Sequence, residues 1–423
     1  MARYIDSAFA DATADWTTRR PGARPRSGPG ASRHVDVLVV GARCAGAATA
    51  MLLARAGHQV VMVDRSRPST DTNSTHSLVR GGVVQLARWG LLEEVVATGA
   101  PEIRSVAFHH EGEVDRRAVR DRAGVDFLLA PRRSVLDDLL ARAAVAAGAE
   151  LVTGTSVTGV LREGDRVVGV TTRDADGTSR DLTARLVVGA DGVYSGMARH
   201  VGAEVVERHD PSGAAFYTYV GGVPWDGFEF HLGERSFAGV FPTHDHLACV
   251  WLIRPVADLA PVIAAGSDRL DAWLGALDHS APDLARRVRR GFVTAPLRGS
   301  VGLPNHVRRA AGPGWALVGD AGFHRDPITG HGMTDAFRDA ELLADAADAM
   351  LRRAVPEDVA MAGYERQRDE ALAPTFALTR ALGAFPPAAR FLDLQRRLSR
   401  ALDTEATALA ARPAPLGVDA YVA

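Results

Sequence analysis

Lysine is missing from this sequence of 423 residues, so all 49 of its basic residues are arginine. A chain without a lysine amine cannot form a Schiff base with a carbonyl substrate, and it cannot bind nucleotide phosphates through the lysine of a P-loop. These two groups of enzyme mechanisms are therefore excluded, whatever the origin of the arginine excess.

Cysteine and long apolar runs are also scarce. Only Cys44 and Cys249 occur, which gives no disulfide framework and indicates a reducing compartment, the cytoplasm. No run of about 18 apolar residues is present, which predicts a protein without a membrane span. The formal net charge is −2, so the chain has no overall surplus of positive charge for nucleic acid. A small molecule is the partner that we expect.

The chain is long enough, and at 47% hydrophobic residues apolar enough, for two or three domains with large cores. Residues 1–33 differ, because they are rich in Arg, Pro, Gly, Ala and Ser and bury little. We predict a disordered extension there. The pair Arg19–Arg20 resembles a twin-arginine export signal, but no uncharged apolar segment follows it directly.

A strand–turn–helix–strand pattern begins at residue 35. The β-branched run 35–40 predicts a strand buried on both faces, a helix with small residues follows, and a second strand at 59–63 ends on Asp64. The N–H groups at the start of such a helix bind a dinucleotide pyrophosphate, and a carboxylate after the second strand binds a ribose hydroxyl. The predicted contacts are Gly41, Arg43, Cys44, Ala45, Gly46, Asp64 and Arg65.

Arg43 stands where the dinucleotide-binding fingerprint has its middle glycine. Its side chain adds a phosphate contact if it turns outward, and the alternative is that residues 41–46 form an ordinary βαβ turn. Cys44 lies at a predicted helix N-terminus, where the pKa of a thiol tends to fall. We favour a small residue packed against a cofactor over a redox role for Cys44.

Two further strands, at residues 186–191 and 315–320, also end in Gly and Asp. Between them, residues 204–300 contain short aromatic runs divided by Gly and Pro turns, which predicts antiparallel strands. After Thr334 the pattern is mainly helical. Five aromatic and four polar side chains of the predicted sheet are candidates for lining a pocket: Phe216, Tyr217, Tyr219, Phe230, Trp251, His231, His244, His246 and Arg254.

Three segments resemble one superfamily of flavoproteins. Residues 189–199 match the Asp-Gly fingerprint of the monooxygenases typified by para-hydroxybenzoate hydroxylase, at Asp191, Gly192, Ser195 and Arg199. Residues 319–333 are similar to the Gly-Asp motif of the same superfamily, in which the Asp binds the ribityl chain of FAD. Arg133 starts a predicted helix at the place where the family has an arginine on FAD.

The resemblance implies further FAD contacts, and these are Arg133, Asp191, Gly192, Asp320, Pro327, Gly330 and Gly332. In relatives, the turn at the third motif leads into a helix whose N-terminus faces the pyrimidine side of the flavin. Reduced flavin is anionic there, and a positive helix end stabilises that charge.

The fold class that the resemblance implies is α/β: a glutathione-reductase-like FAD-binding Rossmann domain, a β-sheet substrate domain and a helical C-terminal region. The expected division has five segments: a disordered extension (1–33), the first part of the FAD-binding domain with some substrate-domain strands near 104–130 (34–203), the substrate domain (204–310), the second part of the FAD-binding domain (311–355) and the C-terminal helical region (356–423).

The implied activity is that of an FAD-dependent monooxygenase. NADPH or NADH reduces the flavin, O2 adds to give the C4a-hydroperoxide, and one oxygen atom passes to a small organic substrate. His324 and His331 flank the flavin-facing turn and are the candidate proton donors. No metal is expected, and reduction by a separate flavin reductase remains an alternative to direct reduction.

Three other activities are weighed. Thr75-His76 and the third motif look closer to geranylgeranyl reductases and halogenases than to phenol hydroxylases, so a double-bond reductase is the first alternative. A halogenase is disfavoured, because the lysine that those enzymes use to relay an oxidised halide is absent. A flavin-binding or carrier protein without turnover is the third, and Arg43 in the phosphate loop favours it. No sharp motif marks the substrate, the choice of NADH or NADPH, or the oligomeric state.

Overall fold

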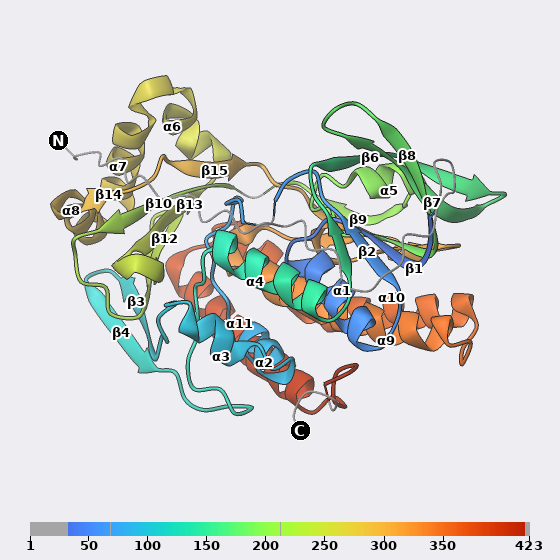
Figure 1. The fold of residues 1–423 in the computed structure, drawn as a ribbon. Helices are drawn as coiled ribbons and strands as arrows, with labels where there is room; N and C mark the ends of the chain where they lie inside the picture. Colours follow the sequence, from blue (N-terminus) through green and yellow to red (C-terminus); the bar gives the residue numbers. More distant parts are fainter. Residues whose placement is uncertain (1–32, 68, 212, 419–423) are drawn as a thin grey trace.

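The structure is a computed structural model that describes residues 33–67, 69–211 and 213–418. The extension predicted at residues 1–33 therefore lies outside the described residues, except for Arg33. Figure 1 shows two large sheets, one on each side of the molecule, with long helices packed beneath them.

The first sheet has eight strands and contains the predicted βαβ unit. Its strand order is β17-β18-β8-β1-β2-β5, with β7 paired to β8 and β6 to β7. The central neighbours β18, β8, β1, β2 and β5 run parallel, which brings their carboxyl ends to one edge. The strands are β1 (Arg33–Val40), β2 (Val60–Val63), β5 (Glu150–Val152), β6 (Thr155–Glu163), β7 (Arg166–Asp174), β8 (Ser179–Gly189), β17 (Ala311–Gly312) and β18 (Trp315–Leu317).

Strand β1 is buried on both faces, as its β-branched run predicts. Val37 and Val39 belong to the core beneath the sheet, whereas Leu38 and Val40 belong to the core on the opposite face. The lower core is made with α1 (Cys44–Arg55), α4 (Arg133–Ala146) and α9 (Gly332–Leu351), and α1 packs against both of the other helices. Small side chains on α1, such as Ala47 and Ala50, are fully buried and allow this close approach. The upper face is covered by β6, β7 and α5 (Gly196–Val201).

The second sheet also has eight strands, in the order β14-β10-β13-β12-β11-β3-β4, with β15 paired to β10. One face packs against α6 (Ala260–Ala264), α7 (Arg269–Ser280) and α8 (Pro282–Arg290). The strands are β3 (Ser105–His110), β4 (Glu113–Ala118), β10 (Ala214–Gly221), β11 (Phe228–Gly233), β12 (Ser236–Pro242), β13 (Ala248–Arg254), β14 (Phe292–Val293) and β15 (Arg298–Val301).

This sheet contains the strands expected between residues 204 and 300, with two departures from the expectation. β11 pairs in parallel with β3, so the sheet is not wholly antiparallel. β9 (Val205–His209) does not join it, and instead forms a three-stranded sheet with β16 (Asn305–Arg308) and β19 (Phe323–His324). Neither pairing has a local signal, because both join segments that are far apart in the sequence.

Helices from both halves of the chain complete the molecule. α10 (Glu357–Gly383) packs along α9, and α11 (Ala388–Ala410) packs against α10 and α2 (Arg80–Arg88), next to α3 (Leu92–Ala97). The chain after Thr334 is thus helical, as predicted. Phe391, Leu394 and Leu398 of α11 join the core under the second sheet. Within the described residues, no helix combines the length and the apolar character needed to cross a membrane.

Candidate active site

A cavity of about 920 Å³ lies at the carboxyl ends of β1, β8 and β18. Its wall contains the predicted contacts Gly41, Arg43, Cys44, Ala45, Asp64, Arg65, Arg133, Asp191, Gly192, Asp320, Pro327, Gly330 and Gly332. Gly46 is not in the wall. Parallel strands end at the same edge of a sheet, so motifs that are far apart in the sequence meet there.

The first loop depends on glycine for a close backbone approach. Gly41 has a φ of +104°, and a Cβ atom there would lie 2.4 Å from the carbonyl oxygen of Ala190. A Cβ atom on Gly46 would lie 1.8 Å from the carbonyl oxygen of Gly41. Gly46 therefore acts indirectly, because it lets α1 begin directly beneath the loop that lines the cavity.

Asp64 at the end of β2 is buried and is held by the loops beside it. One carboxylate oxygen accepts a hydrogen bond from the Ala42 N–H at 2.8 Å, and the other accepts from the Ser66 N–H at 2.8 Å. Arg65 is exposed at the cavity edge. Asp64 thus fixes the geometry of the first loop, and its contact with a ribose stays a prediction.

The guanidinium of Arg43 is engaged within the protein. It donates to the Thr70 carbonyl oxygen at 2.9 Å, to the Thr70 hydroxyl at 2.8 Å and to Asp137 at 3.1 Å. These contacts tie the first loop to Thr70 and to α4. Arg43 also lines the cavity, and its contact with a phosphate stays a prediction.

Cys44, Arg133 and Asp137 form a buried cluster beneath the first loop. The Cys44 thiol donates to Asp137 at 3.1 Å, and Arg133 Nε donates to the same carboxylate oxygen at 3.0 Å. Burial raises the pKa of the Cys44 thiol, against the fall that a helix N-terminus favours. Cys44 is therefore a thiol and not a thiolate at neutral pH.

The second motif forms a capped turn after β8. Asp191 accepts from the Met197 N–H at 3.0 Å, and the Ser195 hydroxyl accepts from the Ala198 N–H at 2.8 Å. Arg199 donates to the Tyr194 carbonyl oxygen at 2.7 Å. The motif thus builds the start of α5, and it also places Asp191 and Gly192 in the cavity wall.

The third motif brings a carboxylate and a helix N-terminus to the cavity. Asp320 is half-buried there, and desolvation raises the pKa of its carboxyl group. The turn 327–329 is capped by Asp326, which accepts from the Ile328 N–H at 3.0 Å, and it ends at Gly330 with a φ of +62°. α9 then begins at Gly332, so its first N–H groups face the cavity as expected.

Both candidate histidines lie in the cavity wall, and each has a protein partner. His324 Nδ1 is 2.6 Å from the carbonyl oxygen of Pro304. His331 Nε2 is 3.4 Å from a carboxylate oxygen of Glu405 on α11, and its Nδ1 has no hydrogen-bond partner within the described chain. Glu405 also pairs with Arg338 at 2.9 Å. A proton role for His324 or His331 stays a prediction.

Sequence reasoning missed Arg325, although it lies inside the third motif. Its side chain is only 2% exposed, and one terminal nitrogen is 2.6 Å from Asp335. Nε and the other terminal nitrogen have no hydrogen-bond partner among the described residues. Buried donors of this kind normally have an acceptor. An anionic or carbonyl-bearing ligand in the cavity would supply one, and no sequence pattern reveals this need.

His76 lies in the wall of the first cavity, between Thr75 and Ser77, which also line a second cavity. It has a φ of +66°, which is uncommon for a residue with a Cβ atom, and its backbone N–H donates to Ser74 Oγ at 3.1 Å. Its ring stacks on Tyr219 and is hydrogen-bonded to the Tyr219 hydroxyl. Burial lowers the pKa of His76 to about 3, so the imidazole is neutral.

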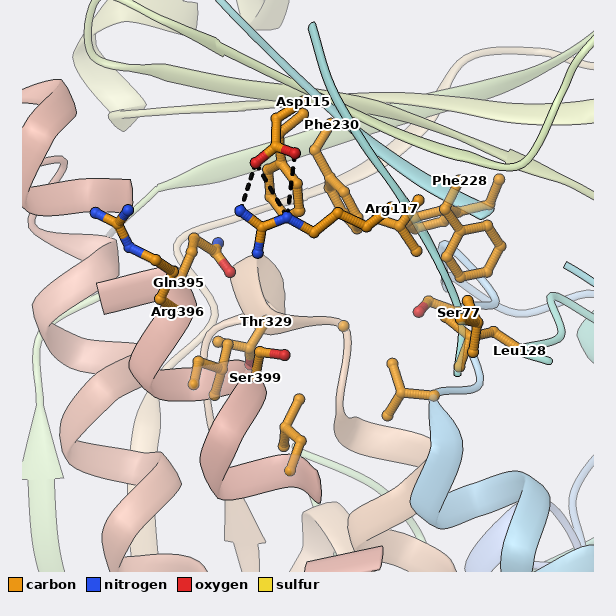
Figure 2. Close-up of a pocket in the computed structure, with 18 of the residues that line it drawn as sticks. Ser77, Asp115, Arg117, Leu128, Phe228, Phe230, Thr329, Gln395, Arg396 and Ser399 are labelled. Atoms are coloured by element: carbon orange, nitrogen blue, oxygen red, sulfur yellow. Dashed lines mark hydrogen bonds and ion pairs between the residues drawn. The ribbon is translucent and has the colours of Figure 1, made fainter. Parts of the chain in front are cut away.

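The second cavity has a volume of about 1030 Å³ and lies between the second sheet and α11. Figure 2 shows Phe228 and Phe230 on the sheet side and Gln395, Arg396 and Ser399 on the helix side. Four residues line both cavities, which therefore adjoin, and these are Thr75, Ser77, Pro327 and Gly330.

The aromatic wall differs in part from the expected one. Phe230 and Trp251 line the second cavity, together with four aromatic residues that the sequence did not single out: Phe108, Phe228, Phe237 and Phe241. Tyr217 and Tyr219 face the 72–76 segment instead, where the Tyr217 hydroxyl accepts from the Ser74 N–H at 3.1 Å.

Other candidates of the second sheet are not in this cavity. Phe216 does not line this cavity, because it packs into the core on the opposite face of the sheet. His231 also points to that face, because neighbouring residues of a strand alternate and Phe230 faces the cavity. The His244 Nε2 atom is hydrogen-bonded to the Thr98 hydroxyl at 2.9 Å. His246 is exposed. The guanidinium of Arg254 lies 3.7 Å from the carboxylate of Asp258.

His231 belongs to a cluster whose ligand atoms lie within 4.8 Å of one another: His109, Glu229 and His231. Arg287 already neutralises Glu229 through two hydrogen bonds, of 2.6 and 3.0 Å. The two imidazole rings stack at 4.1 Å with an interplanar angle of 13°. Their nitrogen lone pairs therefore run side by side and do not converge on one point, so this arrangement does not form a metal site.

The comparisons with known proteins agree with the motifs. A family model described as an FAD binding domain matches residues 34–259. Digeranylgeranylglycerophospholipid reductase 2 of Methanothermobacter thermautotrophicus is 31% identical, over 74% of this chain and 77% of the relative. Squalene epoxidase 2 of Arabidopsis thaliana is 29% identical, over 73% of this chain but only 53% of the relative.

Solved structures show the same fold. One of them is PqsL of Pseudomonas aeruginosa, which is described as a probable FAD-dependent monooxygenase. In its complex with 2-aminobenzoylacetate, PqsL is 25% identical to this chain and has a TM-score of 0.73. The match covers 88% of this chain and all of PqsL. The flavin-dependent brominase Bmp2 has a TM-score of 0.76 at 19% identity, over 89% of this chain and 93% of Bmp2. At that identity, the likeness to Bmp2 concerns the fold alone.

Proposed function

Because this chain belongs to the family defined by that FAD binding domain, and is an FAD-dependent oxidoreductase, we propose that it is a monooxygenase that oxygenates a small organic substrate. NADPH or NADH is the proposed source of electrons, and O2 is the proposed co-substrate. The two cavities meet at the turn 327–330, which would bring a substrate to the flavin. The single observation that favours oxygenation is the likeness to PqsL, described as a probable FAD-dependent monooxygenase, at 25% identity over 88% of this chain.

The residues of the first cavity fit FAD. Its pyrophosphate would lie at the first loop and the N-terminus of α1, with Asp64 near a ribose and Arg133 and Asp320 farther along the molecule. The unpartnered donors of Arg325 and the N-terminus of α9 would stabilise negative charge on the ring system. When bound, FAD supplies the transfer of electrons from the nicotinamide nucleotide and the activation of O2.

The protein's own part would be position and exclusion of water. Ser77 and Thr329 stand where the aromatic cavity opens toward the first cavity, and no charged side chain other than Arg80 lies on the adjoining segment 75–80. An oxygen-transfer step needs such a dry setting, because water diverts reactive oxygen species into side reactions. His331 is the proposed holder of a proton at Nδ1, with its other nitrogen fixed by Glu405.

A second candidate function is the reduction of a double bond. The 31% identity to a digeranylgeranylglycerophospholipid reductase favours it, and the same two cavities would serve it. A reductase transfers hydrogen to the substrate and needs no O2. Halogenation stays disfavoured, since the chain has no lysine.

The test is to load the purified protein with FAD and to record its visible spectrum. Oxidation of NADPH and NADH is then followed in air and under nitrogen, with O2 uptake, for a panel of apolar acids and their methyl esters. The proposal expects substrate-stimulated O2 uptake and a product heavier by one oxygen atom. A product heavier by two hydrogen atoms, formed under nitrogen, would replace it with the reductase.

One variant and a matched control test whether the first cavity binds FAD through Asp320. Asp320→Ala removes the half-buried carboxylate of the first cavity and is expected to lower FAD retention at least tenfold, because a charge-assisted hydrogen bond contributes about 1.5–3 kcal/mol. Asp393→Ala removes a carboxylate of α11 whose side chain is 43% exposed and which lines neither cavity, and it serves as the control. Failure of the unchanged protein to bind FAD at all would refute the proposal.

A further inference from the structure

The second cavity combines an aromatic interior with a charged mouth. Its interior is a contiguous set of rings on β11, β12 and β13, in which Phe230 stacks on Phe237 at 5.5 Å and Phe237 meets Trp251 edge-on at 5.2 Å. Trp251 is 3% exposed and its indole nitrogen has no acceptor among the described residues. At about 1030 Å³ the cavity is at the upper end of ordinary ligand pockets, which span roughly 300–1,000 Å³.

The mouth lies between β4 and α11 and carries an excess of positive charge. Six arginines and three carboxylates line the cavity, in a chain whose formal net charge is −2. Figure 2 shows Asp115 bound to Arg117 on β4, with Arg396 facing them from α11. The local excess of arginine raises the potential at the mouth and attracts anions from solution.

Not every arginine of the mouth is neutralised. Asp115 accepts from Arg117, and Asp403 is shared between Arg80 and Arg122, at 3.3 Å from each. Arg120 and Arg396 make no ion pair within the described part of the chain. These two guanidinium groups come from different elements, the segment after β4 and helix α11, and both lie in the wall of the same cavity.

The inner end of the cavity has the opposite character. Next to the first cavity it presents Thr75, Ser77 and Thr329, which are polar but uncharged, beside Ile328 and Leu128. An anion at this end would face apolar side chains and lose its hydration, which costs several kcal/mol without a partner. A charged group on an occupant would therefore stay at the mouth.

We propose that the substrate is a bulky, largely apolar molecule with one anionic group, held with that group at the mouth, where Arg120 and Arg396 make no ion pair, and with its apolar body against the aromatic wall. The atom that reacts then belongs to the apolar part, at the end that adjoins the first cavity. The inference rests on the proposed function, since it takes the second cavity as the substrate site.

A matched pair of probes tests the proposal without turnover. 8-Anilinonaphthalene-1-sulfonate and N-phenyl-1-naphthylamine share one aromatic body and differ by the sulfonate, and their binding to the FAD-loaded protein is measured by fluorescence titration. The sulfonate probe is expected to bind at least fivefold more tightly than the neutral probe. Added salt is expected to weaken binding of the sulfonate probe only.

Variants of the cavity wall test whether the two arginines bind the sulfonate group. The double variant Arg120→Gln with Arg396→Gln is expected to weaken binding of the sulfonate probe about fivefold, since each exposed charge contact contributes up to about 1 kcal/mol. Binding of the neutral probe is expected to stay unchanged. Arg397→Gln is the control, because Arg397 is exposed on the same helix but does not line the cavity. Ser399→Trp, which fills the cavity from α11, is expected to abolish binding of both probes.

Competition distinguishes the chemistry of the anionic group. Dodecanoate and dodecyl phosphate are each titrated against the bound sulfonate, and displacement by either supports the proposal and identifies a carboxylate or a phosphate. Equal binding of the two probes, an equal loss of both in the double arginine variant, or sulfonate binding that survives Ser399→Trp would overturn it. Because this readout needs no O2 or nucleotide, absence of O2 uptake with intact probe selectivity would count against the proposed function alone.

Discussion

At the scale of single residues, the first loop shows how backbone space decides what a motif can do. Arg43 replaces a glycine at the position where the fingerprint normally lets a ligand approach, and its side chain turns away to Thr70 and Asp137. Gly41 and Gly46 keep their role, because no Cβ atom fits at either position. The side chain of Arg43 is therefore accommodated by Thr70 and Asp137, while the two glycines allow the close packing of the backbone.

Gly46→Ala is expected to destabilise the fold by about 1–3 kcal/mol and to lower FAD retention, since its Cβ atom would overlap the carbonyl oxygen of Gly41. Gly275→Ala is the matched control, at an exposed position of α7 with no atom within 4 Å of the new Cβ. There alanine is expected to stabilise the helix by about 0.5–1 kcal/mol. Urea unfolding and flavin content measure both, and equal effects of the two changes would contradict the packing argument.

At the scale of elements, α11 lines the second cavity and contacts a residue in the wall of the first. Gln395, Arg396 and Ser399 form one wall of the second cavity, and Glu405, farther along the same helix, reaches His331 and Arg338 beside the first cavity. α11 therefore connects the candidate substrate site to the candidate flavin site. The position of the C-terminal region relative to the FAD domain was left open by the sequence, and the structure places it beneath both sheets (Figure 1).

Glu405→Gln is expected to make the midpoint potential of the bound flavin more positive. The change removes a negative charge that lies behind His331 in the wall of the first cavity, and less negative charge near the flavin favours its reduced, anionic form. Arg338 keeps its pairs with Asp335 at 2.8 Å and Asp339 at 2.8 Å, so the buried arginine is not left alone. Spectroelectrochemical titration gives the potential, with Glu370→Gln on the exposed side of α10 as the control. An unchanged midpoint potential would show that the charge of Glu405 does not act on the flavin.

At the scale of the whole molecule, burial of histidine links stability to pH. Burial is the largest cause of the lowered pKa values of His76 and His306, both to about 3, and of His109, to about 4. In the unfolded chain these groups take up protons near pH 6.5. Between about pH 6.5 and 4 the unfolded state thus binds more protons, and the free energy of unfolding falls as pH falls.

Each such histidine is expected to add up to about 1.4 kcal/mol per pH unit to this slope. Urea unfolding of the FAD-saturated protein between pH 5 and 7 measures it. His306→Gln is expected to make the slope shallower by one histidine, and His279→Gln, at an exposed position of α7 that lines neither cavity, serves as the control. A slope that is the same in both variants would show that His306 does not titrate in this way.

The sequence by itself determined the parts of the molecule that are local. The βαβ unit, the turn at Gly330 and the helix after Gly332 depend on residues that are near one another in the chain, and the structure has each of them where the pattern predicts. The meeting of three motifs at one cavity also followed, because the carboxyl ends of neighbouring parallel strands share an edge.

Only the tertiary structure decided which side chains face the second cavity and which partners the buried charges find. Phe216 and Phe230 are equally aromatic in the sequence, but the register of two distant strands puts them on opposite faces of the sheet. The contact of Glu405 with His331 and the mouth between β4 and α11 join segments that are far apart in the sequence, and no local pattern encodes such contacts. Periodicity fixes which elements form, whereas packing between elements fixes what they enclose.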